Sequence, residues 1–105
     1  MTHITTNADA ALFAAIDEWT KAWREVRRLD DEDPGVGVAA EKAIKLERKI
    51  ARMPAMTVDG YHAKIETIRA AEFEDAQLLS IMFALGRDAE RLGIADDPPD
   101  LRASW

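Results

Sequence analysis

Three ionisable residues between positions 59 and 66 have the spacing of a helical metal site. Asp59, His62 and Glu66 stand at i, i+3 and i+7, so a helix would project them from one side. Helical di-iron sites also place a carboxylate three residues before a histidine, but they use that motif twice and add further glutamates. It occurs once here, and a solvated face on which His62 and Glu66 pair is the simpler explanation. We predict no metal and no cofactor.

Nucleophilic and phosphate chemistry lack their usual sequence surroundings. Ser80 lies in an apolar stretch and Ser104 near the C-terminus, and neither has a glycine-rich elbow or a histidine close by in sequence. Gly35 and Gly37 are separated by one residue and follow no predicted strand, unlike a phosphate-binding loop. We therefore predict no catalytic residues and a protein that is not an enzyme.

Two indoles are neighbours on one predicted helix face. Trp19 and Trp23 stand at i, i+4, and each ring can bury on the order of 200 Å² in a core or an interface. An aromatic cage for a ligand is the alternative, and it would require a pocket beside the rings.

A basic strip precedes the centre of the chain and has two interpretations. Its members are Lys42, Lys45, Arg48, Lys49 and Arg52. In an antiparallel pair of helices, Asp17, Glu18 and Glu25 could face the strip as exposed ion pairs. Alternatively, the strip and Lys64 could contact nucleic acid, because the junction around Pro54 loosely resembles a helix-turn-helix.

The distribution of charge favours the first interpretation. The chain of 105 residues has a net charge of -6. Residues 1–37 carry eight acids and four bases, residues 38–69 four acids and seven bases, and residues 70–105 eight acids and three bases. A basic middle between acidic flanks weakens attraction to phosphate, so nucleic acid is a possible partner but not the favoured one.

Four stretches with apolar residues at alternating steps of four and three must position these side chains. Such spacing is typical of α-helices that bury one face. The four rows are Leu12, Ile16, Trp19, Trp23 and Val26; Ala39, Ala43, Leu46, Ile50 and Met53; Val58, Tyr61, Ile65 and Ile68; and Leu78, Met82, Leu85, Ala89 and Leu92. We predict an all-α antiparallel helical bundle or long helical hairpin of three to four helices. Residues 7–94 would form a single helical domain, with a flexible arm at 1–6 and a tail at 95–105.

Capping and helix-breaking residues predict where the first two helices begin and end. Thr6 or Asn7 can cap the first helix, which runs to about Leu29. The acidic, proline- and glycine-containing segment 30–37 is predicted to be a loop. The second helix then runs from about Val38 to Met53 and ends before Pro54.

The second half of the chain has similar signals. Thr57 can cap a third helix. Its apolar row loses phase near residues 72–75, which predicts a kink or short break, with one long bent helix as the alternative. Gly93 can end the last helix in a left-handed conformation.

Composition and the N-terminal residues indicate in which cellular compartment to expect the protein. The chain has no cysteine and so needs no oxidising surroundings. Its first residues lack the basic and apolar regions of a signal peptide, and no apolar run approaches the roughly 18 residues of a membrane span. We expect a cytoplasmic protein with no membrane partner.

An excess of apolar residues at 78–85 predicts a protein interface. Leu79, Ile81 and Phe83 lie outside the apolar row of their helix, so one small bundle would leave some of them uncovered. The predicted interface residues are Trp19, Trp23, Leu78, Leu79, Ile81, Met82 and Phe83. A homodimer is the simplest assembly, and another protein partner is the alternative.

The segment Met53-Pro54-Ala55-Met56-Thr57-Val58-Asp59-Gly60-Tyr61-His62-Ala63-Lys64 resembles the pattern TPATTLAGLAAK of an uncharacterised family of small all-α proteins from alphaproteobacteria and their prophages. A tryptophan-bearing first helix, an acidic loop and an Ala/Glu-rich helix precede it there as here. This chain differs in having Tyr61-His62 in place of small apolar residues and a shorter linker after the third helix. The resemblance implies a helical fold and an accessory bacterial or phage-derived role, with no site residues to transfer.

Overall fold

The computed structural model describes residues 8–71, 73–95 and 101, and within them it contains helices and no strand. The helices are α1 (Ala10–Arg28), α2 (Pro34–Arg52), α3 (Val58–Ala70) and α4 (Asp75–Leu92). The predicted all-α class is confirmed. The predicted arm at 1–6 and the caps Thr6 and Asn7 lie outside the described residues, as does most of the predicted tail.

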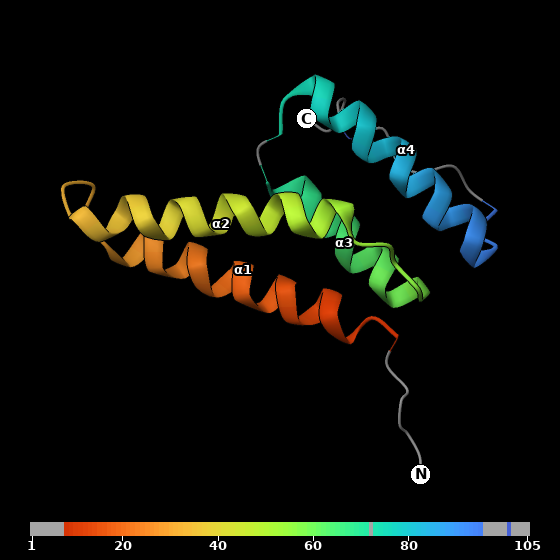
Figure 1. Cartoon of the computed structure of the whole chain (residues 1–105), viewed down its shortest axis with the longest axis horizontal. Helices are drawn as coiled ribbons and strands as arrows, with labels where there is room; N and C mark the ends of the chain where they lie inside the picture. The colour runs from red at the N-terminus through yellow and green to blue at the C-terminus, as the bar shows by residue number, and fades with distance from the viewer. Residues whose placement is uncertain (1–7, 72, 96–100, 102–105) are drawn as a thin grey trace, which may run out of the picture.

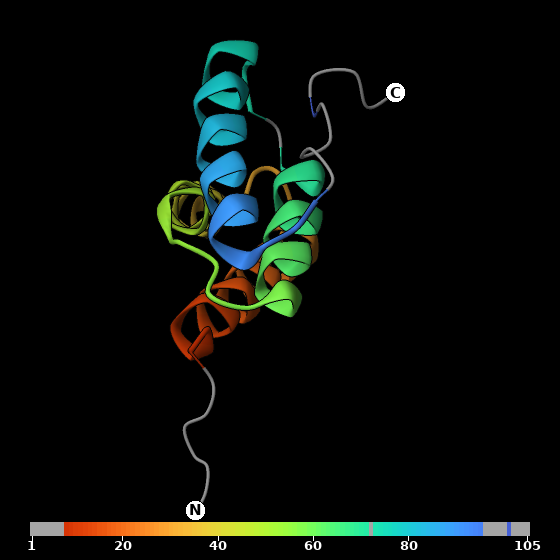
Figure 2. The same ribbon diagram turned by 90° about the vertical axis from the view of Figure 1, so that its right-hand side faces the viewer.

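The helices are distributed unevenly along the molecule. α1 and α2 form a long antiparallel hairpin, and α3 and α4 pack against only one end of it (Figures 1 and 2). We call this the four-helix end, and we call the other part of the hairpin, near the α1–α2 connection, the two-helix end. The four-helix end can enclose a core, whereas the two-helix end leaves much of its surface in solvent.

Burial follows this division. The main core joins all four helices and comprises Leu12, Ala15, Ile50, Ala51, Ala55, Tyr61, Ile65, Ile68, Leu78, Ile81, Leu85, Ala89 and Leu101. A smaller cluster at the two-helix end comprises Ala22, Ala43 and Leu46, with Trp19 and Trp23 partly buried against it. Fully burying a leucine or isoleucine stabilises a fold by roughly 1.5–3 kcal/mol, so most of the hydrophobic stabilisation lies at the four-helix end. Leu101, in the segment expected only to be a tail, belongs to that core.

The start of α2 differs from the sequence prediction. Residues 34–37 were expected in a loop, but α2 begins at Pro34. Asp33 is its N-cap, and its side chain accepts a hydrogen bond from the Gly35 N–H at 2.8 Å. Proline suits the first helical position because its missing N–H and fixed φ cost nothing there, so Pro34 begins α2 and does not prevent a helix at 34–37.

The start of α1 also differs, because the helix begins at Ala10 with Asp9 at its N-cap position, later than a cap at Thr6 or Asn7 would place it. The remaining predicted boundaries agree with the structure to within one residue. Thr57 caps α3 by accepting from the Gly60 N–H, and Gly93 ends α4 with φ of 71°. α3 and α4 are separate helices, so the predicted break is confirmed and the single bent helix is excluded. At the start of α4, the Gln77 side chain accepts from the Glu74 N–H at 3.0 Å. No helix within the described ranges is long and apolar enough to cross a membrane.

Candidate functional site

The basic strip lies on the exposed surface of α2. Lys42, Lys45, Arg48, Lys49 and Arg52 are all exposed. Lys45 pairs with Glu41 of its own helix at 3.2 Å. The acids on α1 pair with bases of α1 instead: Asp17 with Lys21 at 3.0 Å, and Glu25 with Arg28. Within the described residues the strip is therefore not neutralised by α1, although α1 and α2 are antiparallel.

The face of α3 gives little support to a helix-turn-helix. Its exposed charged and polar residues are Asp59, His62, Glu66 and Arg69, and Arg69 lies 4.0 Å from Glu66. A recognition helix needs basic side chains near the phosphates of DNA, whereas this face carries both acidic and basic residues. Asp59, His62 and Glu66 of this face are the residues with the spacing of a helical metal site. In the described part of the chain no group of three potential ligands is close enough together to hold a metal ion.

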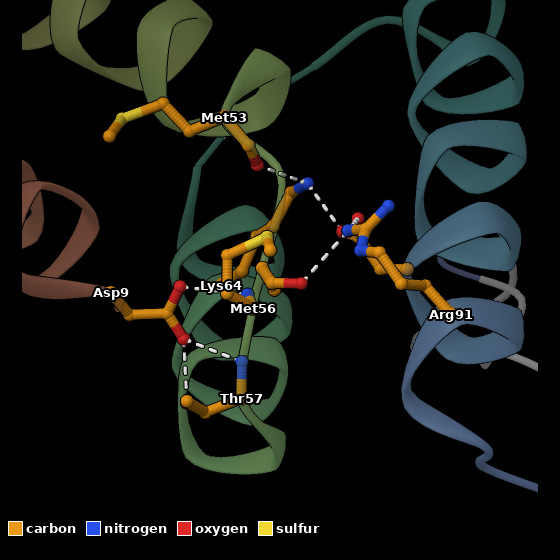
Figure 3. A network of polar contacts seen from close by, with 8 residues as sticks. Asp9, Met53, Met56, Thr57, Lys64 and Arg91 are labelled. Carbon is orange, nitrogen blue, oxygen red and sulfur yellow. Dashed lines mark hydrogen bonds and ion pairs between the residues drawn. The ribbon is translucent and has the colours of Figure 1, made fainter. Parts of the chain in front are cut away.

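Lys64 has to be removed from the predicted nucleic-acid contacts because it is buried. Its side chain is 1% exposed, and Nζ donates to Asp88 Oδ2 at 2.8 Å and to the Met53 carbonyl at 2.7 Å. Arg91 donates to the other carboxylate oxygen of Asp88 and, at 2.9 Å, to the Ala55 carbonyl. These contacts connect α3, α4 and the α2–α3 turn (Figure 3). Lys64 is therefore a structural residue that phosphate cannot reach.

A second buried carboxylate organises the same turn from the other side. Asp9, the residue before α1, accepts from the Met56 N–H at 2.8 Å, the Thr57 N–H at 2.9 Å and the Thr57 hydroxyl at 2.6 Å (Figure 3). Its negative charge lies at the N-terminus of α3, where the helix dipole stabilises an anion. A Cβ added at Gly60 would lie 2.0 Å from Asp9 Oδ2, so only glycine fits there.

Tyr61 packs close to this network. Its ring is 3% exposed. Burial, and then the negative charge of Asp88, raise the pKa of the Tyr61 phenol above its usual value, because both disfavour the phenolate. The phenol therefore stays neutral in the fold at physiological pH.

The predicted interface on α4 is reduced by two residues. Leu78 and Ile81 are 8% and 7% exposed and pack into the main core, so they cannot face a partner. Leu79 and Phe83 point outward, with 42% and 71% of their surface exposed, and Met82 is half-buried. With Gly86, Arg87 and Glu90 these three residues line an open hollow of about 470 Å³.

Gly86 is unusual within that hollow. It lies inside α4, where glycine costs up to about 1 kcal/mol relative to alanine. A Cβ built at Gly86 meets no atom of the described residues within 4 Å, so their contacts do not require a glycine. The position leaves room for the close approach of another backbone or side chain.

The tryptophan pair lies at a pocket. The Nε1 atoms of Trp19 and Trp23 donate to the same oxygen, Oε2 of Glu47 on α2, at 2.9 and 3.0 Å. The two indoles and Glu47 line a cavity of about 430 Å³ whose other walls are Val26, Arg27, Ile44 and Ala70. This volume is within the range of small-molecule pockets. Glu47 is the member of this site that the sequence did not single out.

A sequence signal for the buried charges nevertheless exists. The exposed fractions of Glu47, Lys64 and Asp88 are 6%, 1% and 2%. Each stands in phase with the apolar row of its helix: Glu47 between Ala43 and Ile50, Lys64 between Tyr61 and Ile68, and Asp88 between Leu85 and Leu92. A charged residue four or three positions from two core residues on its helix is directed inward.

No family model, curated protein or solved structure matches the chain. The arrangement of its surfaces is thus the basis for assigning a function.

Proposed function

We propose that the protein acts by protein–protein association in the cytoplasm, through the outer face of α4, and that its simplest partner is a second copy of the chain. The observation that supports this most directly is the exposed Phe83, 71% of whose surface is accessible beside the exposed Leu79. Large apolar side chains that line one hollow together are typical of interaction sites on small soluble domains.

The outer face has its own helix-pairing pattern. Ala76, Leu79, Phe83 and Gly86 follow one another at steps of three, four and three, and we call them the outer row. Two antiparallel outer rows can pair Leu79 of one copy with Phe83 of the other, and Ala76 with Gly86. Small residues at both ends of such a row allow the helix axes to approach closely.

Charge along α4 favours the antiparallel arrangement. Glu74 and Asp75 lie at its start, whereas its last turns expose two bases, Arg87 and Arg91, and one acid, Glu90. A parallel pair would place the acids of both copies together. An antiparallel pair places the acids of each copy near the arginine side chains of the other, and the two helix dipoles then run in opposite directions, which is favourable. A two-fold symmetric pair of this kind is closed and does not polymerise.

Phe83→Glu tests this proposal, and the chain offers a matched control. Val38 on α2 is also 71% exposed but lies outside the outer row, so Val38→Glu introduces the same charge on a comparably accessible apolar residue. We expect sedimentation equilibrium to give a dimer for the unaltered chain and for Val38→Glu. Phe83→Glu should weaken the dimer by about 30-fold or more, the effect of losing roughly 2 kcal/mol at an interface centre. A monomer across micromolar concentrations would contradict the homodimer.

The exposed basic strip supports a second candidate, a nucleic-acid-binding regulator. Lys42, Arg48, Lys49 and Arg52 form no ion pair with the other described residues, so they are available to phosphate. Lys45→Glu combined with Lys49→Glu should abolish salt-dependent binding to duplex DNA while leaving protein association unchanged. Absence of salt-sensitive DNA binding by the unaltered chain would exclude this candidate.

A further inference from the structure

Glu47 carries a negative charge that its two hydrogen-bond donors do not require. Its side chain is almost fully buried, with the residue 6% exposed, and both indole N–H groups donate to Oε2 alone. Two neutral donors would be satisfied by the carbonyl oxygen of a glutamine. The second carboxylate oxygen, Oε1, receives no hydrogen bond from the other described residues.

No cation of the described chain compensates this charge. Arg27 is the only basic residue among the described residues that line the cavity, and it is exposed and makes no ion pair with Glu47. A buried carboxylate without a positive partner is costly, whereas most buried charges are paired or bind a ligand. The site thus has an unmatched negative charge at the wall of a cavity.

The other walls select the kind of cation. Trp19 and Trp23 line the cavity with their indoles, and Val26, Ile44 and Ala70 contribute apolar surface. The face of an aromatic ring attracts cations electrostatically, most strongly for tryptophan, and aromatic cages recognise methylated ammonium groups. A primary ammonium needs three acceptors, but Oε1 is the single unsatisfied acceptor identified. A methylated ammonium has apolar methyl groups that suit the remaining walls, and one carboxylate is too few ligands for a metal ion.

We propose that the Trp19–Trp23–Glu47 cavity binds a methylated ammonium group, with the cation against the indole rings and beside Glu47. The site shares no lining residue with the hollow on α4 and does not depend on protein association. The ammonium could belong to a free metabolite of the choline type or to a methylated lysine side chain, which offer the same chemistry.

Titration with choline, followed through the indole N–H resonances of Trp19 and Trp23, tests the proposal. Its neutral isostere 3,3-dimethyl-1-butanol has the same shape without the charge. At constant ionic strength we expect saturable shifts with choline, with a dissociation constant on the order of 1 mM, and at least tenfold weaker binding of the isostere. Equal binding of the two, or no saturable shift with any methylated ammonium, would overturn the proposal.

Two variants separate charge from structure. Glu47→Gln keeps an oxygen acceptor for both indoles and should keep the fold, yet it should weaken choline at least tenfold. Arg27→Gln removes the only cation that lines the cavity within the described part of the chain and should tighten choline about two- to fivefold, because a like charge at the site opposes binding. Unchanged affinity in Glu47→Gln, with indole resonances showing an intact site, would also contradict the assignment.

A third arm distinguishes the sources of the ammonium. A short peptide with one trimethyl-lysine is compared with its unmethylated form and with choline. Tighter binding of the methylated peptide than of choline indicates a protein ligand, and tighter binding of choline indicates a free metabolite. Both results support the site, and failure of every methylated compound refutes it while leaving the test on Phe83 unaffected.

Discussion

At the four-helix end, the buried ammonium of Lys64 meets the Asp88 carboxylate and the Met53 carbonyl, and Arg91 binds the second Asp88 oxygen. Where the two-helix end meets α3, buried Glu47 meets only the neutral N–H groups of two indoles among the described residues. Both ends bury charge on the apolar row of a helix. They differ in whether the described residues of the chain supply the opposite charge.

This difference separates a structural role from a binding role. The Lys64–Asp88 pair holds α3 against α4, and its atoms are inaccessible to any ligand. Glu47 holds α1 and α2 together through hydrogen bonds that do not consume its charge, and it borders a cavity. Removing charge should therefore cost stability at the first end and binding at the second.

Lys64→Met should have the largest effect. It leaves Asp88 buried with Arg91 as its remaining cation, and breaking a buried ion pair on one side costs about 3–5 kcal/mol. Urea unfolding followed by circular dichroism measures the loss. The double variant Lys64→Met/Asp88→Leu should recover part of the stability, because it removes the orphaned carboxylate. A loss below about 1 kcal/mol in the single variant would mean that the pair is not structural.

Gly60→Ala should have the next largest effect, again at the four-helix end. The new methyl group would displace Asp9 Oδ2 and break its hydrogen bonds to the 56–57 turn, at a cost of about 2–4 kcal/mol. Gly37→Ala is the matched control, because a Cβ there meets nothing within 4 Å inside α2. The control should be neutral or stabilising by up to about 1 kcal/mol in the same unfolding assay. Equal effects of the two variants would contradict the close packing at Gly60.

Glu47→Gln should change stability by no more than about 1 kcal/mol, despite the burial of this residue. The amide oxygen can still accept from both indoles, so the two-helix end keeps its hydrogen bonds. Glu47→Leu leaves two indole N–H groups without an acceptor and should cost about 1–3 kcal/mol. The contrast between the two ends would fail if Glu47→Gln were as destabilising as Lys64→Met in thermal or urea unfolding.

Tyr61 provides the smallest effect, which is absent at neutral pH. Its pKa is raised in the fold, so the unfolded chain loses the phenolic proton first as the pH rises. Below the ordinary tyrosine pKa the phenol is neutral in both states and the free energy of unfolding does not depend on its titration. As the pH rises from the ordinary pKa through the raised pKa, the free energy of unfolding falls. Tyr61 is the single tyrosine of the chain, so ultraviolet absorbance of tyrosinate reports it directly. Titration at the same pH in folded and urea-unfolded protein would contradict this expectation.

Helix boundaries could be predicted from sequence where local chemistry decides them. Thr57 and Gly93 gave correct ends because a side-chain cap and a left-handed glycine act within a few residues. The predicted start of α2 is wrong because proline disrupts the interior of a helix but is favoured at the first helical position, where Pro34 lies. The sequence around it contains both signals, and the position of Asp33 decides between them.

The candidate site could be predicted only in part. Trp19 and Trp23 were recognised as a pair, but a partner on α2, such as Glu47, depends on how two helices are set against each other. Lys64 was assigned to the surface by its charge, although its phase between Tyr61 and Ile68 directs it inward. Leu78 belongs to the predicted apolar row, and its burial agrees with that row. Ile81 lies outside the row and could not be separated from Leu79 and Phe83 by sequence, since that requires the side from which α3 and α2 cover α4.

The close approach of Asp9 to Gly60 has a consequence for the divergence of this sequence. A side chain can appear at position 60 only if position 9 gives up its carboxylate or the α2–α3 turn moves away. Substitutions at the two positions should consequently be accepted together and rejected singly. An aspartate before the first helix with a glycine three residues after the cap of the third is thus a compact signature for recognising distant relatives whose remaining residues have drifted.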